Sequence, residues 1–347
     1  MSTLSEVAPA PILSIRELSV EINSNDHRSL ATRGIGLDLC QGEVLGLVGE
    51  SGCGKTLTCK AIMGLLPEGI ARVQTGEVLF SGHDLTRASN TTMRGFRGNT
   101  LSMIFQDPLN ALNPVLTIGE QLGEVLRTHT TLKRKEIYEE SLLMLRRVGL
   151  PDANRKMNAY PHQLSGGMKQ RVVIAMALLM EPDVILADEP TTALDVTVQA
   201  QILKLLKSFQ RNHNTAILLV THDLGVIAEM CDRVAVMYAG RIIETGTVEA
   251  IFDHPSHPYT AKLLEASPRG RPVPRGDLSV IPGIVPSDPD TISGCKFSSR
   301  CDRVQEICKR TEPQLKRVRE GSTRVDPHMV SCFIAFEEAE GFNHDAE

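Results

Sequence analysis

A glycine-rich segment, "GESGCGKT" at positions 49–56, has the residue types and spacing best suited to chemistry. It fits the pattern G-x-x-x-x-G-K-[ST], follows the apolar run Val44–Val48 and leads into a predicted helix. Small residues let successive N–H groups surround phosphate oxygens, and the helix N-terminus adds positive potential. We predict a phosphate-binding loop, with Lys55 at the outer phosphates, Thr56 at Mg²⁺ and Cys53 as a small spacer, rather than an ordinary glycine-rich turn. Its predicted nucleotide-binding residues are Gly49, Glu50, Ser51, Gly52, Cys53, Gly54, Lys55 and Thr56.

Two acidic residues follow a second apolar run, in "PDVILADEP". The predicted strand Val184–Ala187 ends at Asp188 and Glu189. A carboxylate at a strand end can hold Mg²⁺ directly or through water, and its neighbour can deprotonate an attacking water. We assign Asp188 to the metal and Glu189 to general base catalysis. Two solvated acids at a strand end are the alternative, which the phosphate loop upstream disfavours.

A second anion-binding helix start is predicted in "YPHQLSGGMKQRVVIAMALL". Ser165, Gly166 and Gly167 open this helix, and exposed N–H groups at a helix N-terminus attract phosphate. One chain with two such helix starts indicates a composite nucleotide site shared between two chains.

The order of these motifs resembles that of ABC ATPases over residues 12 to about 250. "LSGGM" is similar to their signature motif, with Met168 where Gln is more usual, and it precedes "DEPTTALD". The resemblance implies that Gln106 in "MIFQDP" senses magnesium and moves with a transport partner. It also implies that Asp195 in "TALD" bridges a dimer and that His222 in "THD" positions the γ-phosphate and attacking water. The catalytic residues are then Glu189, His222 and Gln106, and the Mg²⁺ ligands are Thr56, Gln106 and Asp188.

The adenine contact departs from the pattern of this family. Many ABC ATPases stack an aromatic ring on adenine, but "EINSNDHRSLATRGIGLDL" contains no Phe, Tyr or Trp. His27 or Arg28 could offer a planar face instead. Both are equally explained as solvated loop residues, so ATP as the bound nucleotide is implied by the resemblance alone.

The elements that must position these residues follow an α/β pattern. Apolar strands before residue 106 and from 183 to 242 alternate with helical runs, which predicts a mainly parallel sheet. Residues 107–168 turn helical and resemble the helical subdomain of ABC ATPases, and Gly240 supplies the turn of a hairpin in "MYAGRIIETG". The fold class is thus a P-loop NTPase ABC ATPase domain with a mainly parallel sheet, an antiparallel β subdomain, a helical subdomain and a small cysteine-bearing C-terminal extension.

The predicted domain boundaries follow changes in composition. "HPSHPYT" is a rigid bend between two helices, where His254 and His257 serve as capping or turn residues rather than metal ligands. From Ser267 onward the sequence becomes rich in Pro and Gly. The predicted division is an ATPase domain at 12–252, a connection with a short helix at 253–294, a cysteine-ligated region at 295–336 and a flexible tail at 337–347.

Four of the eight cysteines lie near the C-terminal end with the spacing C-x5-C-x6-C-x23-C. Structural zinc sites usually contain C-x2-4-C, which neither short gap matches, whereas four thiolates are the normal ligand set of an iron–sulfur cluster. "HPSHPYT", "IPGIVP" and the cysteine-bearing tail are together similar to the dipeptide and oligopeptide importer subfamily of ABC transporters. That resemblance implies a [4Fe–4S] cluster, with zinc and unligated thiols as the alternatives. Its ligands are Cys295, Cys301, Cys308 and Cys332.

Composition excludes several classes of protein. The 347 residues carry 37 basic and 42 acidic side chains, a net charge of −5, without a long basic tract, which disfavours nucleic acid as the main partner. No apolar run is long enough to span a bilayer, and the first residues lack a secretory leader, so we expect a peripheral protein in a reducing compartment.

The resemblance implies a function and a set of partners. We expect an ATP-hydrolysing subunit that powers import of dipeptides or oligopeptides from the cytoplasmic face of the bacterial inner membrane. Its partners are a second ABC ATPase subunit, expected to be a paralogue in a heterodimer, two transmembrane permeases and a periplasmic or extracellular substrate-binding protein. A cargo of nickel, opines or glycopeptides and a soluble ABC ATPase acting on DNA or ribosomes are the alternatives.

Overall fold

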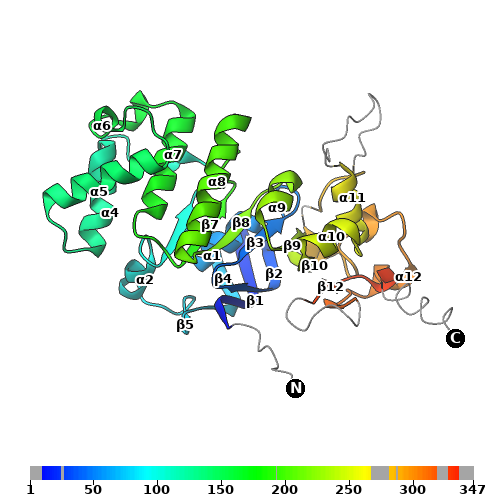
Figure 1. The fold of residues 1–347 in the computed structure, drawn as a ribbon. Helices are drawn as coiled ribbons and strands as arrows, with labels where there is room; N and C mark the ends of the chain where they lie inside the picture. The colour runs from blue at the N-terminus through cyan, green and yellow to red at the C-terminus, as the bar shows by residue number, and fades with distance from the viewer. Residues whose placement is uncertain are drawn as a thin grey trace, which may run out of the picture. The chain divides into compact units, whose positions relative to one another are not determined.

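The computed structural model describes residues 10–24, 27–192, 194–266, 281–286, 288–318 and 327–335. Their contacts divide the chain into two compact units, which are taken separately below (Figure 1). The phosphate-loop unit contains the described residues of Met1–Asp38, Leu45–Thr86 and Thr221–Glu347. The helical unit contains those of Leu39–Val44 and Arg87–Val220.

A four-stranded sheet in the phosphate-loop unit has the order β2-β1-β4-β5. Its apolar positions show why β1 is bulged: Leu13 and Ile15 are buried, and the next buried pair is Leu18 and Val20, which breaks strict alternation. The pairing of β1 with β4 shifts at the same place, where Glu17 has φ 48°. A bulge adds one residue and restores the apolar side chains to the same face. The strands are β1 (Pro11–Ser24), β2 (His27–Cys40), β4 (Ala71–Phe80) and β5 (His83–Asp84).

Strands of a second sheet lead into the phosphate loop. β3 (Val44–Val48) pairs in parallel with β9 (Arg233–Tyr238), which pairs antiparallel with β10 (Arg241–Thr247). Gly240 lies in the turn between β9 and β10 with φ 84°, so the predicted hairpin is confirmed. Two short strands from the C-terminal region extend this sheet beyond β10, namely β12 (Met329–Val330) and then β11 (Lys316–Arg317).

The helices of the phosphate-loop unit include both sides of the predicted "HPSHPYT" bend, which the structure confirms between α10 and α11. His254 is the C-terminal cap of α10, and Nδ1 of His257 accepts a hydrogen bond from the Tyr259 N–H at 3.0 Å. Burial lowers the pKa of His257 to about 4, so the ring is neutral and suited to this capping role. The helices are α1 (Lys55–Ile62), α9 (Leu224–Met230), α10 (Val248–Asp253), α11 (Pro258–Ala266), η2 (Pro289–Thr291), η3 (Ser298–Arg300) and α12 (Glu306–Arg310).

The C-terminal region shares the core of this unit. Phe297 is fully buried and packs with Tyr238 of β9 and Tyr259 of α11, with ring centroids 5.3 and 5.5 Å away. Tyr238 and Tyr259 also contact each other at 4.8 Å. The burial of Phe297 therefore anchors the cysteine segment to the sheet.

The helical unit is built on three parallel strands, β6 (Leu101–Ile104), β7 (Val184–Asp188) and β8 (Ala216–Val220), in the order β8-β7-β6. Every residue of these strands is buried, as in a parallel sheet covered on both faces. Together with the antiparallel elements above, they confirm the predicted α/β architecture.

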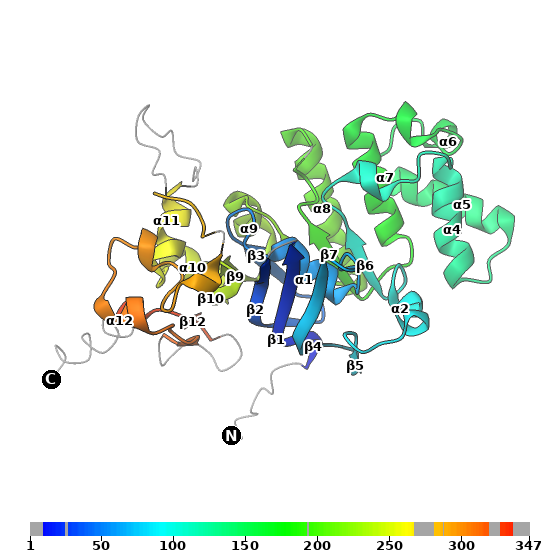
Figure 2. The same ribbon diagram turned by 180° about the vertical axis from the view of Figure 1, so that it is seen from behind.

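Helices connect β6 to β7 (Figures 1 and 2) and confirm the predicted helical segment at 107–168. The first long one, α4, begins with a capping box: Thr117 Oγ1 accepts from the Glu120 N–H, and the Glu120 carboxylate accepts from the Thr117 N–H. The helices of this unit are α2 (Asn90–Phe96), α3 (Pro108–Ala111), α4 (Ile118–His129), α5 (Arg134–Arg147), α6 (Ala153–Lys156), η1 (Pro161–Gln163), α7 (Gly166–Leu178) and α8 (Val196–His213).

Within the described ranges, no helix has both the length and the apolar character that crossing a bilayer requires. The predicted Pro- and Gly-rich connection falls partly outside those ranges, at 267–280 and 287, and the predicted flexible tail at 337–347 falls entirely outside them.

Candidate active site

The phosphate loop connects β3 to α1 and depends on glycine at close backbone contacts. Gly54 has φ 109°, and a Cβ there would lie 2.7 Å from the Ala31 carbonyl oxygen. A Cβ at Gly49 would lie 2.2 Å from the Met237 carbonyl oxygen, whereas one at Gly52, with φ 82°, would meet nothing within 4 Å. The loop is therefore packed closely at both ends and open at Gly52, where small residues leave room for a ligand.

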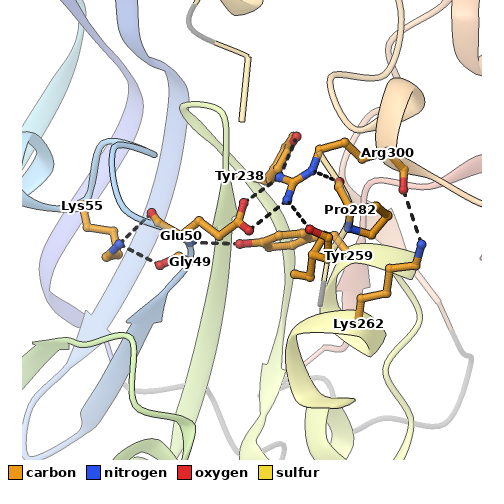
Figure 3. Close-up of polar contacts among 9 residues, drawn as sticks. Gly49, Glu50, Lys55, Tyr238, Tyr259, Lys262, Pro282 and Arg300 are labelled. Atoms are coloured by element: carbon orange, nitrogen blue, oxygen red, sulfur yellow. Dashed lines mark hydrogen bonds and ion pairs between the residues drawn. The ribbon is translucent and has the colours of Figure 1, made fainter. Parts of the chain in front are cut away.

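Lys55 is buried at the first position of α1, with its ammonium group turned back onto the loop. Its Nζ donates to the carbonyl oxygens of Gly49 at 2.8 Å and Glu50 at 3.0 Å (Figure 3). Nζ also lies 3.7 Å from Cys53 Sγ, and burial raises the pKa of that thiol, so Cys53 stays protonated. These contacts place a buried positive charge at the centre of the loop, as binding of an anionic ligand requires.

Glu50 is held at its backbone and its side chain (Figure 3). Its N–H donates to the Tyr259 hydroxyl at 2.9 Å, its carbonyl accepts from Lys55, and its carboxylate accepts from Nη1 and Nη2 of Arg300 at 2.6 and 3.0 Å. The sequence pattern gives no signal for Arg300, which lies between two cysteines of the C-terminal region. Tyr259 belongs to "HPSHPYT", a segment that predicts a bend and contributes to the family resemblance but gives no signal for a contact with the phosphate loop.

Two of the predicted catalytic residues meet in the helical unit. Glu189 follows β7 with φ 46°, and its N–H donates to the Val220 carbonyl oxygen at 2.9 Å. Gln106, which follows the parallel neighbour β6, donates from Nε2 to Glu189 Oε2 at 2.9 Å, and Thr192 Oγ1 donates to the same oxygen at 2.9 Å. A left-handed conformation at a non-glycine residue stores strain, a feature that concentrates at functional sites. The buried Asp188 ends β7 immediately before this carboxylate.

The predicted dimer-bridging residues cap two exposed helix starts in the helical unit. Ser165 is the N-cap of α7, and its hydroxyl accepts from the Met168 N–H at 3.4 Å. A Cβ added at Gly166 would meet nothing within 4 Å, so the first turn of α7 is open. Asp195 caps α8 in the same way, because its carboxylate accepts from the Val198 N–H at 3.0 Å. These caps leave the first-turn N–H groups of both helices at the surface.

His222 belongs to the phosphate-loop unit and is exposed. The residue before it, Thr221, donates its N–H to the carbonyl oxygen of Leu47 in β3 at 3.4 Å. His222 is therefore the residue after a backbone contact with β3, the strand that leads into the phosphate loop. Of the two residues considered for adenine, Arg28 lies on β2 with an exposed side chain, and the side chain of His27 lies outside the described part of the structure.

The four C-terminal cysteines line one small cavity together with His257 and Phe297. Burial, with the neighbouring thiols as a smaller cause, raises the pKa of Cys295 to about 11, and burial also raises the pKa of Cys301 and Cys332. Thiols with raised pKa values stay protonated unless a metal displaces the proton. Among the described residues, no group of three or more His, Cys, Asp or Glu side chains is arranged so that it could hold a metal ion. The structure thus brings the cysteines together without forming a metal-ligand set.

Comparisons of the sequence with known proteins identify relatives that are transport ATP-binding proteins. The ABC transporter family matches residues 32–192, and the family "Oligopeptide/dipeptide transporter, C-terminal region" matches residues 243–308. The chain is 48% identical over 330 residues to a dipeptide transport ATP-binding protein of Bacillus subtilis, covering 95% of this chain and 96% of that protein. It is 45% identical over 335 residues to an oligopeptide transport ATP-binding protein of Haemophilus influenzae, covering 96% and 99% of the two chains.

Solved structures show the same fold. A dimeric ATP-binding cassette in a post-hydrolysis state, bound to ADP and phosphate, is similar with a TM-score of 0.62 and 27% identity, covering 68% of this chain and 98% of that chain. A component of an ABC transporter complex from Clostridium perfringens has a TM-score of 0.58 and 29% identity, with coverage of 71% and 92%. The fold is that of a P-loop ABC ATPase, and the chain belongs to the family of ABC transporter ATP-binding subunits of the dipeptide and oligopeptide importer type.

Proposed function

We propose that this chain hydrolyses ATP to power the import of dipeptides or oligopeptides through a membrane complex. One observation supports a peptide as the cargo: the similarity to a dipeptide transport ATP-binding protein extends over 95% of this chain. It includes the C-terminal region, where residues 243–308 match the family described as the C-terminal region of oligopeptide and dipeptide transporters.

In this proposal the phosphate loop at 49–56 binds the phosphates of ATP, and Lys55 neutralises the outer ones. Mg²⁺, when bound, would offset negative charge on the phosphates. Glu189 accepts a proton from the attacking water, and its hydrogen bond with Gln106 supports a shared role at the γ-phosphate end of the site. His222 holds the γ-phosphate and water in place. The magnesium ligands are Thr56, Asp188 and Gln106, partly through water.

The open helix starts at Ser165-Gly166-Gly167 and Asp195 support a site completed by a second subunit. That subunit is a paralogue in this proposal, so the working pair is a heterodimer. The Gln106 surface contacts one of two transmembrane permeases, a separate substrate-binding protein delivers the peptide, and the chain works at the cytoplasmic face of the inner membrane without binding nucleic acid.

The proposed domain division places the ATPase domain at 12–252, its helical subdomain at 107–168, the connection at 253–294, the cysteine-ligated region at 295–336 and the tail at 337–347. Cys295, Cys301, Cys308 and Cys332 hold a [4Fe–4S] cluster in this proposal, which the shared cavity and the four-thiol set support. The described thiols do not form a ligand set, so binding of a cluster would require their side chains to rearrange.

Metal analysis tests the cluster. The full chain purified without oxygen should contain about four iron and four sulfide per chain, and a Cys332→Ser variant should lose most of both. Zinc in place of iron, or no metal with all thiols free to react with a thiol reagent, would show that the cysteines have a different role.

Uptake measurements test the peptide cargo. A strain lacking this chain should lose uptake of labelled dipeptides or oligopeptides, and restoring the chain should recover it. A Glu189→Gln copy, expressed at the same level, should fail to restore uptake. Loss of nickel, opine or glycopeptide uptake with intact peptide uptake would assign another cargo, and no loss of any uptake would favour a soluble ABC ATPase.

A further inference from the structure

Arg300 occupies an unusual position for a residue of the cysteine segment. It ends η3, immediately before Cys301, yet its side chain is only 4% exposed and reaches the phosphate loop. Besides the two bonds to the Glu50 carboxylate, Nε donates to the Pro282 carbonyl oxygen at 2.9 Å (Figure 3). Nη1 also donates to the Tyr238 hydroxyl at 3.4 Å. A guanidinium group bound along several edges has one orientation, so the position of Arg300 is set by the fold around it.

The Arg300 guanidinium also lies against two aromatic rings. Its Cζ is 5.8 Å from the centroid of the Tyr238 ring and 6.0 Å from that of Phe297. Hydrogen bonds with Glu50 raise the pKa of Arg300 above its ordinary value, so the guanidinium group stays charged. The charged guanidinium therefore offsets the negative charge of the Glu50 carboxylate beside the first residues of the phosphate loop.

The contact constrains the loop through Glu50. Because the N–H, the carbonyl and the carboxylate of Glu50 are each bonded, the peptide groups on both sides of it have little freedom. The Glu50 carbonyl is also one of the two backbone acceptors of Lys55. The orientation of Glu50 thus helps to set where the Lys55 ammonium group lies.

The ion pair between Arg300 and Glu50 also reduces electrostatic repulsion between the Glu50 carboxylate and a bound phosphate. The phosphate loop must receive a polyanion, and an unpaired carboxylate at Glu50 would repel phosphate at short range. The two-pronged bond from Arg300 neutralises that carboxylate and points its oxygens away from the loop backbone.

A second contact links the same region to a strand beside the loop. Asp290 of η2 pairs with Nη1 of Arg33 in β2 at 2.5 Å and accepts from the Leu30 N–H at 3.3 Å. Ala31, between those two residues, provides the carbonyl oxygen that approaches Gly54. The C-terminal region therefore bonds to the loop at Glu50 and to the strand that packs against Gly54.

From these contacts we infer that Arg300 is a positioning residue for nucleotide binding: its ion pair with Glu50 neutralises and orients the start of the phosphate loop. The segment that carries the cysteines thus contributes a residue to the ATP site of its own chain. This role does not depend on the proposed peptide cargo or on the metal content of the cysteines.

A double-mutant cycle in the full chain tests this role. The variants are Arg300→Gln, Glu50→Gln and the double variant, and the readout is the Kd of a fluorescent ATP analogue with Mg²⁺, measured beside the thermal midpoint. Arg300→Gln should raise the Kd at least about fivefold, because it leaves the Glu50 carboxylate unpaired near phosphate. The double variant should lose less affinity than the sum of the two single losses, because the carboxylate is gone.

Controls separate this role from a general effect on folding. Arg310→Gln removes an exposed arginine of the same segment, which pairs with Glu306 at 3.8 Å, and should keep wild-type affinity. Arg300→Lys keeps the charge without the planar fork and should bind about threefold or more weakly than wild type; this comparison decides the matter if Arg300→Gln does not fold.

Three results would overturn the inference. They are wild-type affinity in a folded Arg300→Gln or Arg300→Lys variant, strictly additive losses in the cycle, or an equal loss in Arg310→Gln.

Discussion

Individual residues show where sequence patterns succeed and where they stop. The pattern G-x-x-x-x-G-K-[ST] predicts which side chains form the phosphate loop, because spacing alone decides which N–H groups can converge. The pattern does not predict which residues bind Glu50. Arg300 lies 250 residues away in the sequence, and only folding brings the two side chains together. The hydrogen bond between Gln106 and Glu189 was likewise not predictable, since it depends on the order of β6 and β7 in the sheet.

A pair of glycine substitutions tests the packing of the phosphate loop at this scale. Both Gly54 and Gly52 have positive φ, but only a Cβ at Gly54 would collide with backbone, at the Ala31 carbonyl oxygen. Gly54→Ala should therefore weaken binding of a fluorescent ATP analogue at least about tenfold, and Gly52→Ala should weaken it less. Equal losses in the two variants would mean that backbone strain, rather than the contact with Ala31, limits the loop.

Among the elements, the predictions held where a local pattern repeats. The helical segment at 107–168, the hairpin at Gly240 and the "HPSHPYT" bend were all visible as periodicity or turn residues. The bulge in β1 was missed, although Leu13, Ile15, Leu18 and Val20 carry its signal as a broken alternation. The pairing of β12 with β10 was not predictable, because a two-residue strand has no periodicity.

The capping box of α4 provides a test of helix stability. Thr117→Ala removes the N-cap hydroxyl and should lower the free energy of unfolding by about 1 kcal/mol at neutral pH, measured by urea denaturation. ATP binding should be unchanged, since α4 carries none of the residues assigned to the nucleotide.

The same variant has a pH signature. Hydrogen bonds from the Thr117 hydroxyl and N–H lower the pKa of Glu120, so this stabilisation is present above the ordinary carboxylate pKa and lost as pH falls through the lowered one. The stability difference between wild type and Thr117→Ala should therefore narrow between neutral pH and about pH 3. A difference that stays constant over that range would contradict the assignment of the hydroxyl bond.

At the scale of the whole molecule, the C-terminal region is part of the ATPase rather than an appendage. Phe297 packs between β9 and α11, β12 extends the sheet at β10, and Arg300 reaches the phosphate loop. Composition alone indicates a separate appendage, because a Pro- and Gly-rich stretch precedes this region and its few apolar residues cannot form a core alone. Long-range packing of a single aromatic side chain is not visible in composition.

Removing that side chain tests how the region is attached. Phe297→Ala should lower the free energy of unfolding by about 3–5 kcal/mol, the usual cost of truncating a buried phenylalanine. It should also expose the C-terminal region to limited proteolysis before the rest of the chain. An unchanged thermal midpoint together with an unchanged proteolysis pattern would show that Phe297 does not anchor the region.

The most direct test of the account as a whole is steady-state phosphate release from Mg²⁺-ATP by the full chain and its Glu189→Gln variant. The account assigns proton abstraction to the Glu189 carboxylate, which accepts a hydrogen bond from Gln106. It predicts that Glu189→Gln loses at least about 100-fold in hydrolysis rate while still binding ATP. A Glu189→Gln variant that binds ATP and hydrolyses it as fast as wild type would contradict it.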